Sequence, residues 1–483
     1  MATTTARAAP AAREVPGPVG HPVIGNLLAF KNDTVGTLVE GFRTYGDIVR
    51  FRGVGPLFPN YLVVHPDHVS YVLKENAENY PRTPGVRRHW HALVGDGLIC
   101  TEGELWRAQR KLAQPSFDPR RLQAFDGVIA DETAAMLERW DTAAEAGTTL
   151  DVAREMTRLA LANVGRSLYS TDWREESAVI ADAVEFTIQY TYKALTLPVA
   201  PSERLPIPEI RRFKSWRRRL EVIMERLIAQ RRASGTEKDD LLGRLLSARD
   251  ESGRPLSDYQ LRSHLMTFMF GGHETVAIGM AWTWCLLSQH PEVRRKLEQE
   301  IDEALNGAAP TFENTVDLDY LNRVINEALR LRPPVWLISR APLQDDEIAG
   351  YPIPAGAQIL VSPYVTHRHP AFWANPEGFD PDRWLPEQVA ERPRNAWFPF
   401  SGGPHQCIGG YLGQMEMRIV IAQVLQRFEP ELVPGHPVVP RLGITMGFEH
   451  GLAMTVRRRP PLERKGSGRS AEQAVAADAV RTA

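Results

Sequence analysis

The stretch Phe400-Ser-Gly-Gly-Pro-His-Gln-Cys-Ile-Gly-Gly410 carries the most information about the fold of this chain. Its glycines let the backbone turn tightly and approach a flat ligand closely. A helical pattern follows at once, from Tyr411 to Phe428. Cys407 therefore lies just before a helix N-terminus, where free peptide N–H groups and the positive end of the helix dipole stabilise a thiolate. This placement favours Cys407 as an axial ligand to a metal.

The chain has three cysteines, Cys100, Cys285 and Cys407, which are far apart. An odd, scattered set predicts no disulfide framework and fits a reducing compartment. Three thiols are also too few for an iron–sulfur cluster, which usually takes four, so any such electron carrier is another protein. A lone cysteine is most often an inert buried residue, and we interpret Cys100 and Cys285 in that way. Cys407 differs because its glycine-rich neighbours would make a poor core segment.

The composition is that of an ordinary globular protein. Of 483 residues, 43% are hydrophobic and 24% charged, and the formal net charge is −2. These values exclude a mainly disordered or collagen-like chain and give no overall field that would attract nucleic acid or an anionic membrane. No Gly-x-Gly-x-x-Gly motif follows a strand, so a flavin or nicotinamide domain is not expected inside this chain.

The longest helical segment is predicted from Ser257 to Gln289. Ser257 and Gln260 have capping-box spacing, and His290-Pro291 ends the segment. Residues 265–287 are apolar nearly all round, so a transmembrane span is the alternative. The Gly-Gly-His-Glu run at residues 271–274 interrupts them in the middle, where charge is costly in lipid. We therefore expect a buried central helix with a polar notch.

The rest of the pattern predicts a mainly α fold with a small β part. A single domain is expected over residues 20–458, between a flexible leader (1–19) and a disordered tail (459–483). The proline-rich connection at residues 195–210 is expected to be a mobile lid. Further helices are predicted at residues 131–146, 151–168, 211–232, 291–306 and 317–331. Strands are predicted at residues 47–51, 61–64 and 358–361, with a hairpin over 444–456 that turns at 449–451.

Four segments together resemble one family. The run Phe400-x-x-Gly403-x-His405-x-Cys407-x-Gly409 resembles the haem-binding signature of the cytochrome P-450 family, the haem-thiolate monooxygenases. Glu327-Ala-Leu-Arg330 is similar to its E-x-x-R motif, and Phe379-Asp-Pro-Asp-Arg-Trp384 to its aromatic-Pro-x-Arg segment. Gly271-Gly-His-Glu-Thr275 is similar to its oxygen-activating motif. The resemblance spans nearly the whole body and implies a P-450 fold, with haem between the long central helix and the cysteine loop.

The resemblance also implies roles at the centre of that fold. Cys407 would be the axial ligand of haem b, iron protoporphyrin IX, and Glu274 and Thr275 would be the acid and alcohol that relay protons to dioxygen. Without the resemblance, a mid-helix threonine that bonds back to a preceding carbonyl is an equally good interpretation of Thr275. Gly271 replaces the more usual alanine and Val276 a frequent second threonine, which alters pocket width but leaves the relay intact.

Other residues are expected to contact haem or to support its site. Trp106 and Arg110 share a helix face and match the family's W-x-x-x-R pair for the haem propionates. His405 stands where many members have arginine, and Arg340 is a weaker candidate for which a surface ion pair is the alternative. The expected haem-contacting residues are Cys407, His405, Trp106, Arg110, Arg340, Phe400, Gly403, Gly409 and Gly271. The residues assigned to scaffold are Glu327, Arg330 and Arg383.

The expected function is haem-dependent hydroxylation or epoxidation of a lipophilic small molecule such as a terpenoid, fatty-acyl or polyketide-like compound. The enzyme would consume O2 and two electrons, which a ferredoxin or flavodoxin with its reductase would supply. The protein is expected to be a cytoplasmic monomer without a transmembrane segment. The expected pocket residues are Phe268, Phe270, Val335, Trp336, Ile338 and Phe448. A basic patch for an acidic electron-transfer partner is considered at Arg107, Lys111 and Arg418, with a solvated face as the alternative. A haem-thiolate sensor or carrier, a peroxide-driven peroxygenase and a helical scaffold without haem remain open.

Overall fold

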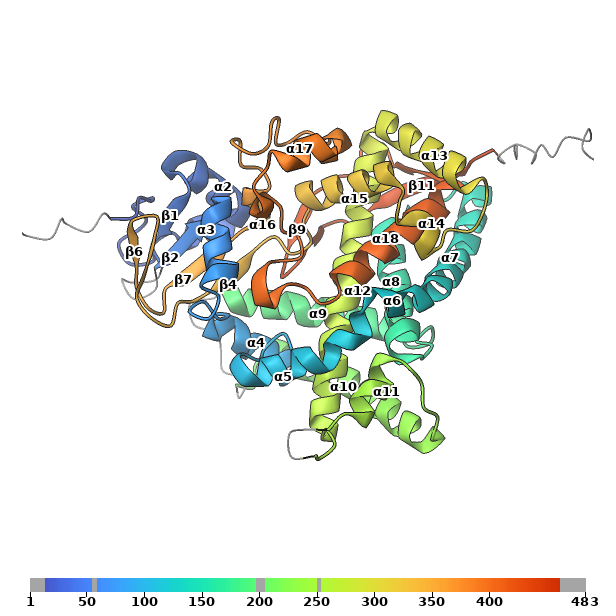
Figure 1. Cartoon of the computed structure of the whole chain (residues 1–483), viewed down its shortest axis with the longest axis horizontal. Coiled ribbons are helices and arrows are strands. Elements are labelled where there is room, and N and C mark those ends of the chain that lie inside the picture. The colour runs from blue at the N-terminus through green and yellow to red at the C-terminus, as the bar shows by residue number, and fades with distance from the viewer. Residues whose placement is uncertain (1–13, 54–58, 197–204, 250–252, 461–483) are drawn as a thin grey trace, which may run out of the picture.

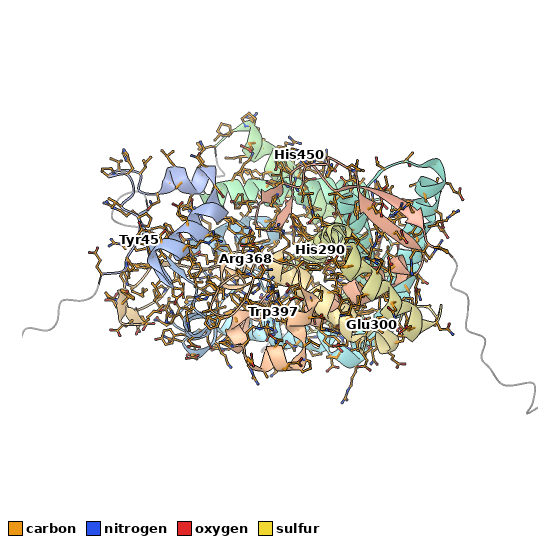
Figure 2. The ribbon with its side chains drawn as sticks, turned by 90° about the horizontal axis from the view of Figure 1, so that it is seen from above. Tyr45, His290, Glu300, Arg368, Trp397 and His450 are labelled. Carbon is orange, nitrogen blue, oxygen red and sulfur yellow. The ribbon has the colours of Figure 1, made fainter. Side chains whose placement is uncertain are left out.

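The computed structural model describes residues 14–53, 59–196, 205–249 and 253–460. Its architecture is mainly helical with a small β part, as predicted. In Figure 1 the helices fill the middle and one side of the molecule, and the largest sheet lies at the other side. Figure 2 shows the same elements from above, with their side chains drawn.

The long helix α12 (Asp258–Gln289) runs through the middle of the molecule (Figure 1). Ser257 caps it as expected, since its hydroxyl accepts from Gln260 N–H and Gln260 Oε1 accepts from Ser257 N–H at 2.9 Å. It packs against α8 (Val152–Tyr169), α15 (Asp319–Leu331) and α18 (Gly410–Leu425). Residues buried on all its sides explain why its sequence is apolar nearly all round.

The two halves of α12 belong to different hydrophobic clusters. Residues from Leu261 to Phe270 pack in one cluster, and residues from Ala277 to Leu287 pack in another. Between them, Gly271 is exposed, and Glu274, Thr275 and Val276 are partly accessible. The predicted polar notch therefore coincides with the gap between two cores.

The other helices surround this centre. The remaining α-helices are α1 (Leu27–Asn32), α2 (Thr34–Tyr45), α3 (Pro66–Ser70), α4 (Pro84–Val94), α5 (Gly103–Ala113), α6 (Pro119–Leu122), α7 (Asp126–Ala146), α9 (Ser177–Thr196), α10 (Pro208–Ser234), α11 (Leu241–Ser247), α13 (Pro291–Leu305), α14 (Phe312–Thr315), α16 (Pro363–Thr366) and α17 (Pro386–Ala390). A π-helical turn, η1 (Tyr71–Glu75), and a 3-10 turn, η6 (Gly403–His405), lie near the cysteine loop.

Within the described residues, the strands form four small sheets. The largest has the order β1 (Ile48–Phe51), β2 (Asn60–Val63), β7 (Gln358–Val361), β4 (Ile338–Arg340), and only β2 and β7 in it are parallel. The three-stranded sheet has the order β3 (Leu150–Asp151), β11 (Ala453–Arg458), β8 (Phe428–Leu432). The two-stranded sheets pair β5 (Asp346–Ile348) with β6 (Tyr351–Ile353) and β9 (Pro440–Leu442) with β10 (Met446–Phe448).

The predicted hairpin over residues 444–456 was wrong in its pairing. A turn does lie near residue 450, but β10 pairs with β9 upstream and β11 pairs with β8 and β3. The leader boundary also differs, because Val15 is buried and Pro16 O accepts from Arg50 N–H at 2.8 Å. The predicted start of the tail at residue 459 also differs, because Arg459 pairs with Asp302 at 2.6 Å. Residues 1–13 of the leader, 461–483 of the tail and 197–204 of the expected lid lie outside the described residues.

Candidate active site

Cys407 lies in the short loop between η6 and α18. Its N–H donates to Phe400 O at 2.9 Å, which closes the loop. Burial raises the pKa of its thiol, while hydrogen bonds from the N–H groups of Gly409 and Gly410 and the charge of Arg110 lower it. The N-terminus of α18 thus offers two peptide N–H groups to the sulfur, as expected from the sequence.

Cys407 combines an exposed residue surface with a desolvated thiol. Its residue surface is exposed, yet burial among protein atoms dominates its thiol pKa. Gly271 on α12 is exposed in the same way, and a Cβ placed there would meet no other atom within 4 Å. Two segments far apart in the sequence therefore each present accessible surface, one at Cys407 and one at Gly271.

Gly403 is required by the packing of the loop. Its φ of +66° favours glycine, and a Cβ there would lie 1.9 Å from Leu73 O in η1. Phe400 covers Gly410, where an added Cβ would be 3.2 Å from the Phe400 ring. At Gly409 the nearest atom to an added Cβ is on Phe117, at 3.8 Å. Gly403 thus serves close backbone packing, whereas Gly409 has room around it.

Glu274 and Thr275 lie in the notch of α12. Thr275 Oγ1 donates to Gly271 O at 2.9 Å, which is the local back-bonding considered from the sequence. Burial raises the pKa of Glu274 to about 7, against a hydrogen bond with Thr445 and the charge of Arg441, which lower it. The carboxyl can therefore hold or release a proton near neutral pH.

The predicted propionate partners gather beside the cysteine loop. The Trp106 and His405 rings lie 4.2 Å apart between centroids. Arg110 Nη1 donates to Gln406 O at 2.8 Å, so α5 is tied directly to the loop. Arg340 is buried, which lowers its pKa to about 9, and its Nη1 donates to Ser339 O at 3.0 Å. Among the described contacts, no carboxylate pairs with Arg340. The surface ion pair considered as its alternative role is therefore not found.

Two further members of this cluster were missed from the sequence. Glu102 Oε1 accepts from Arg82 Nη1 at 3.0 Å, and Glu102 Oε2 lies 3.2 Å from His405 Nε2. Burial alone would raise the pKa of Glu102, but His405 and Arg82 lower it to about 2. No local motif marks this pairing, because its members come from three separate segments.

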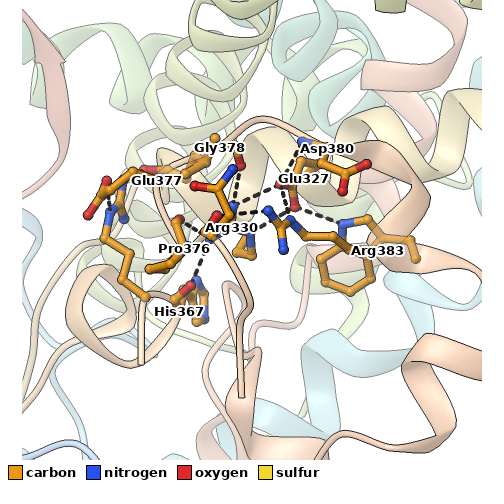
Figure 3. Close-up of polar contacts among 12 residues, drawn as sticks. Glu327, Arg330, His367, Pro376, Glu377, Gly378, Asp380 and Arg383 are labelled. Carbon is orange, nitrogen blue, oxygen red and sulfur yellow. Dashed lines mark hydrogen bonds and ion pairs between the residues drawn. The ribbon is translucent and has the colours of Figure 1, made fainter. Parts of the chain in front are cut away.

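Glu327, Arg330 and Arg383 are brought together in one buried network (Figure 3). Nε and Nη2 of Arg330 each donate to a Glu327 carboxylate oxygen at 2.8 Å, and both side chains are fully buried. Arg330 also donates to three carbonyl oxygens, those of His367, Pro376 and Gly378. Arg383 Nε lies 3.2 Å from Glu327 Oε1, so the exposed i,i+3 pair considered as an alternative does not occur.

His367 connects this network to the cysteine loop. Its carbonyl oxygen accepts from Arg330 Nη1 at 2.9 Å, and its Nε2 accepts from Phe398 N–H at 2.9 Å. Phe398 O in turn accepts from Ser401 N–H at 3.0 Å. Nothing in the sequence predicts this role, because His367 belongs to none of the recognised motifs.

The comparisons with known proteins agree with this geometry. The family model described as Cytochrome P450 matches residues 15–449. The chain belongs to the cytochrome P450 family. It is 34% identical to cyclooctatin synthase of Streptomyces melanosporofaciens, over 90% of this chain and 94% of that protein. Cyclooctat-9-en-7-ol 5-monooxygenase of the same organism is 36% identical, over 87% and 90%. The crystal structure of the cytochrome P450DA heme domain superposes with a TM-score of 0.84 at 28% identity, over 94% of this chain and 99% of that one.

As a cytochrome P450 monooxygenase, the enzyme takes haem as cofactor, needs O2 and a redox partner, and acts on a lipophilic substrate. The residues present fit haem. Cys407 is exposed, and Gly271 on α12 leaves space around its backbone. Among the described residues, buried Nδ1 of His405 lacks a hydrogen-bond partner, as expected beside a polar group of a ligand.

The six predicted pocket residues of this P450 differ in their surroundings. Phe268 packs on Phe117 and Phe270 on Trp90, with centroids 5.4 and 6.5 Å apart. Val335 and Ile338 are partly accessible. Trp336 and Phe448 are buried: Trp336 Nε1 donates to Gly443 O at 3.0 Å, and Phe448 stacks on Trp282 at 4.0 Å. These last two side chains anchor the segment around β9 and β10.

The considered basic patch does not include Arg418. Arg418 is buried on α18, its Nη1 is 3.4 Å from Asn322 Oδ1, and its guanidinium lies 5.9 Å from the centre of the Tyr411 ring. The physical reason is that α18 is covered on most of its sides by neighbouring helices. Within the described parts of this P450, none of the helices combines the length and apolar character needed to cross a bilayer.

Proposed function

We propose that this P450 inserts one oxygen atom into a ring-containing, unsaturated terpenoid, using haem b held by Cys407. The names of two relatives support this class, because one is a synthase of cyclooctatin and the other a monooxygenase of cyclooctat-9-en-7-ol. The apolar side chains Phe268 and Phe270 near the notch of α12 suit such a substrate. When bound, haem supplies the oxygen-activating redox chemistry.

The observation that carries the proposal is the accessible sulfur of Cys407, which faces the peptide N–H groups of Gly409 and Gly410. These N–H groups stabilise negative charge on the sulfur. Trp106, Arg110, Arg340 and His405 would hold the haem carboxylates, since each of the four is a cationic or ring N–H donor near the loop.

On the other side of the site, Glu274 would hold a proton and Thr275 would pass it on. Burial raises the pKa of Glu274 to about 7, so its carboxyl is partly protonated near neutral pH. Thr275 Oγ1 donates its own hydrogen to Gly271 O, which leaves its oxygen free to accept. The reaction consumes two protons and two electrons, and the second oxygen atom leaves as water. Because the chain has no flavin motif and too few cysteines for an iron–sulfur cluster, the electrons would come from a separate ferredoxin or flavodoxin and its reductase.

The enzyme would act as a cytoplasmic monomer. The test is a panel of cyclic terpenoid hydrocarbons and alcohols, screened against the purified haem protein by absorption spectroscopy and then by product analysis with a surrogate ferredoxin system. We expect saturable binding spectra and oxygenated products for members of this panel. Binding confined to linear fatty acids, with no oxygenated terpenoid product, would contradict the substrate class.

A further inference from the structure

Helix α10 carries an exposed basic surface that the reaction does not use. Six of the nine residues from Arg211 to Arg219 are arginine or lysine. Two of them have carboxylate partners on the same helix: Arg217 lies 3.5 Å from Glu221, and Arg218 lies 2.9 Å from Glu225. The other four are exposed, and the described contacts give none of them a carboxylate partner. These four residues form the α10 basic surface: Arg211, Arg212, Lys214 and Arg219.

The spacing of these charges is unfavourable for the helix itself. Arg211 and Lys214 are three positions apart, and Lys214 and Arg218 are four positions apart, so like charges are neighbours on one face of α10. Farther along the same helix, Arg232 is compensated by Asp258 at 2.8 Å. A surface that breaks a local rule of helix stability without compensation is expected at a functional site. The α10 basic surface is therefore a candidate for contact with a partner of opposite charge.

Two of its guanidinium groups are held against aromatic rings. The guanidinium carbon of Arg212 lies 4.4 Å from the centre of the Phe186 ring on α9, and that of Arg219 lies 4.6 Å from the Trp216 ring. A ring on the face of a guanidinium leaves its N–H edge free to bind a carboxylate with two hydrogen bonds. Arg212 and Arg219 are seven positions apart, so the two groups repeat at about 10.5 Å along the helix. Carboxylates seven residues apart on another helix have the same repeat.

The α10 basic surface lacks the apolar side chains of a membrane-binding helix. Within the described stretch 210–220 no apolar side chain is exposed, and Ile210, Phe213 and Leu220 are buried. The exposed apolar side chains of this region lie before or after that stretch: Leu205, Ile207 and Val222. A helix on a bilayer surface buries apolar side chains beside its basic ones. The surface therefore favours a protein partner over a lipid surface.

The length of the α10 basic surface also restricts the partner. Residues 211–219 rise about 12 Å along the helix axis. The carboxylates of Glu209 and Glu221 stand before and after them. A nucleic acid backbone carries a regular row of phosphate charges and would extend past these carboxylates. A short segment with a few carboxylates on one face matches the surface better.

We propose that the α10 basic surface binds an acidic helical segment of another protein, with two of its carboxylates on the N–H edges of Arg212 and Arg219. Arg211 and Lys214 add attraction and speed the association. Helix α10 packs on α9 and α12 and is a separate element from α5, which carries the basic residues considered for the electron carrier. The partner is therefore a different protein from that carrier, and the proposal holds for any substrate of the enzyme.

The test is the binding of two synthetic acidic helices to the haem-loaded full chain, measured by fluorescence anisotropy. Both peptides have the same composition, but one carries its glutamates on one face, seven residues apart, and the other distributes them around the helix. We expect the one-face peptide to bind about tenfold more tightly. R212Q/R219Q should remove this preference, whereas R211Q/K214Q should weaken the binding of both peptides alike. The matched control is R226Q/R232Q, which removes two paired charges from the same helix and should keep the preference.

Equal affinity of the wild-type enzyme for the two peptides would overturn the proposal, because it would reveal attraction by charge alone. Tighter binding of phosphatidylglycerol vesicles or of duplex DNA than of the one-face peptide would also overturn it, in favour of a membrane or a nucleic acid. Haem reduction by a surrogate ferredoxin distinguishes the electron carrier. R212Q/R219Q should be reduced at the wild-type rate, and slower reduction would assign the surface to that carrier and overturn the proposal.

Discussion

Glu327 and Arg330 form a fully buried ion pair with two hydrogen bonds of 2.8 Å. Three main-chain carbonyls take the remaining Arg330 donors, and Asp380 N–H, Arg383 and Trp384 Nε1 donate to Glu327. Such a satisfied network holds several segments in one arrangement. The Glu327–Arg330 pair therefore fixes the positions of the segments that support the cysteine loop.

Removing one partner of this pair should be costly. We expect R330Q to lower the free energy of unfolding by about 3–5 kcal/mol, because it leaves the Glu327 charge buried. Chemical denaturation followed by tryptophan fluorescence measures this. The matched control is E104Q, which breaks the exposed i,i+3 pair with Arg107 and should cost less than about 0.5 kcal/mol. Equal costs for the two variants would contradict the structural role.

His367 should help to hold the cysteine loop in place, because it links the Glu327–Arg330 network to that loop. In H367A the buried N–H of Phe398 loses its acceptor, which costs about 1–3 kcal/mol. Since Phe398 lies two residues before Phe400, which accepts from Cys407 N–H, we expect faster loss of haem to apomyoglobin. H436A removes a similar histidine–backbone contact near Gly451 and should leave haem transfer unchanged. Identical transfer rates in H367A and wild type would remove the proposed link.

Gly403 should tolerate no side chain. In G403A the methyl group would clash with the Leu73 carbonyl at 1.9 Å, in addition to the strain of a φ of +66°. Gly435 also has a positive φ, +80°, but open space around it, so G435A measures the backbone strain alone, about 1–2 kcal/mol. We expect purified G403A to contain much less haem per chain than G435A. Full haem content in G403A would show that η1 can move away at little cost.

Glu416 should make stability depend on pH. It is buried on α18, where Asn163 Nδ2 donates to its Oε1 at 2.8 Å. Burial raises its pKa to about 8, from 4.5. Protonated Glu416 contributes fully to the stability of the fold below about pH 4.5. This contribution is lost as the pH rises through 8, because the carboxyl of the unfolded chain releases its proton at a lower pH than the buried one.

E416Q lacks this titration. We therefore expect the free energy of unfolding of wild type to fall relative to that of E416Q by about 3–4 kcal/mol between pH 5 and pH 8. Denaturant titrations at several pH values give this difference. Parallel pH curves for the two proteins would show that Glu416 is ionised in the fold.

The sequence was sufficient for elements with local signals. The capping box of Ser257 and Gln260 and the apolar run after it predicted α12, and glycines with a following helix marked the loop of Cys407. Features built from distant segments were missed. Strand β10 pairs with β9 and strand β11 with β8 and β3, although the turn near residue 450 suggested one hairpin.

The same limit applies within the site. Cys407, Glu274 and Thr275 stand in motifs, so their residue types and spacing could be interpreted directly. Glu102 and His367 act through partners 303 and 31 positions away, and nothing near them in the sequence predicts those contacts. The structure also gave Gly403 a packing role that its motif alone did not predict.

The most direct test of the account is the absorption spectrum of the reduced protein with carbon monoxide, in wild type and in C407A. A thiolate ligand predicts a strongly red-shifted Soret band in the wild-type protein, and its absence in C407A. A wild-type spectrum without that band, or the same band in C407A, would contradict the assignment of Cys407 as the haem ligand.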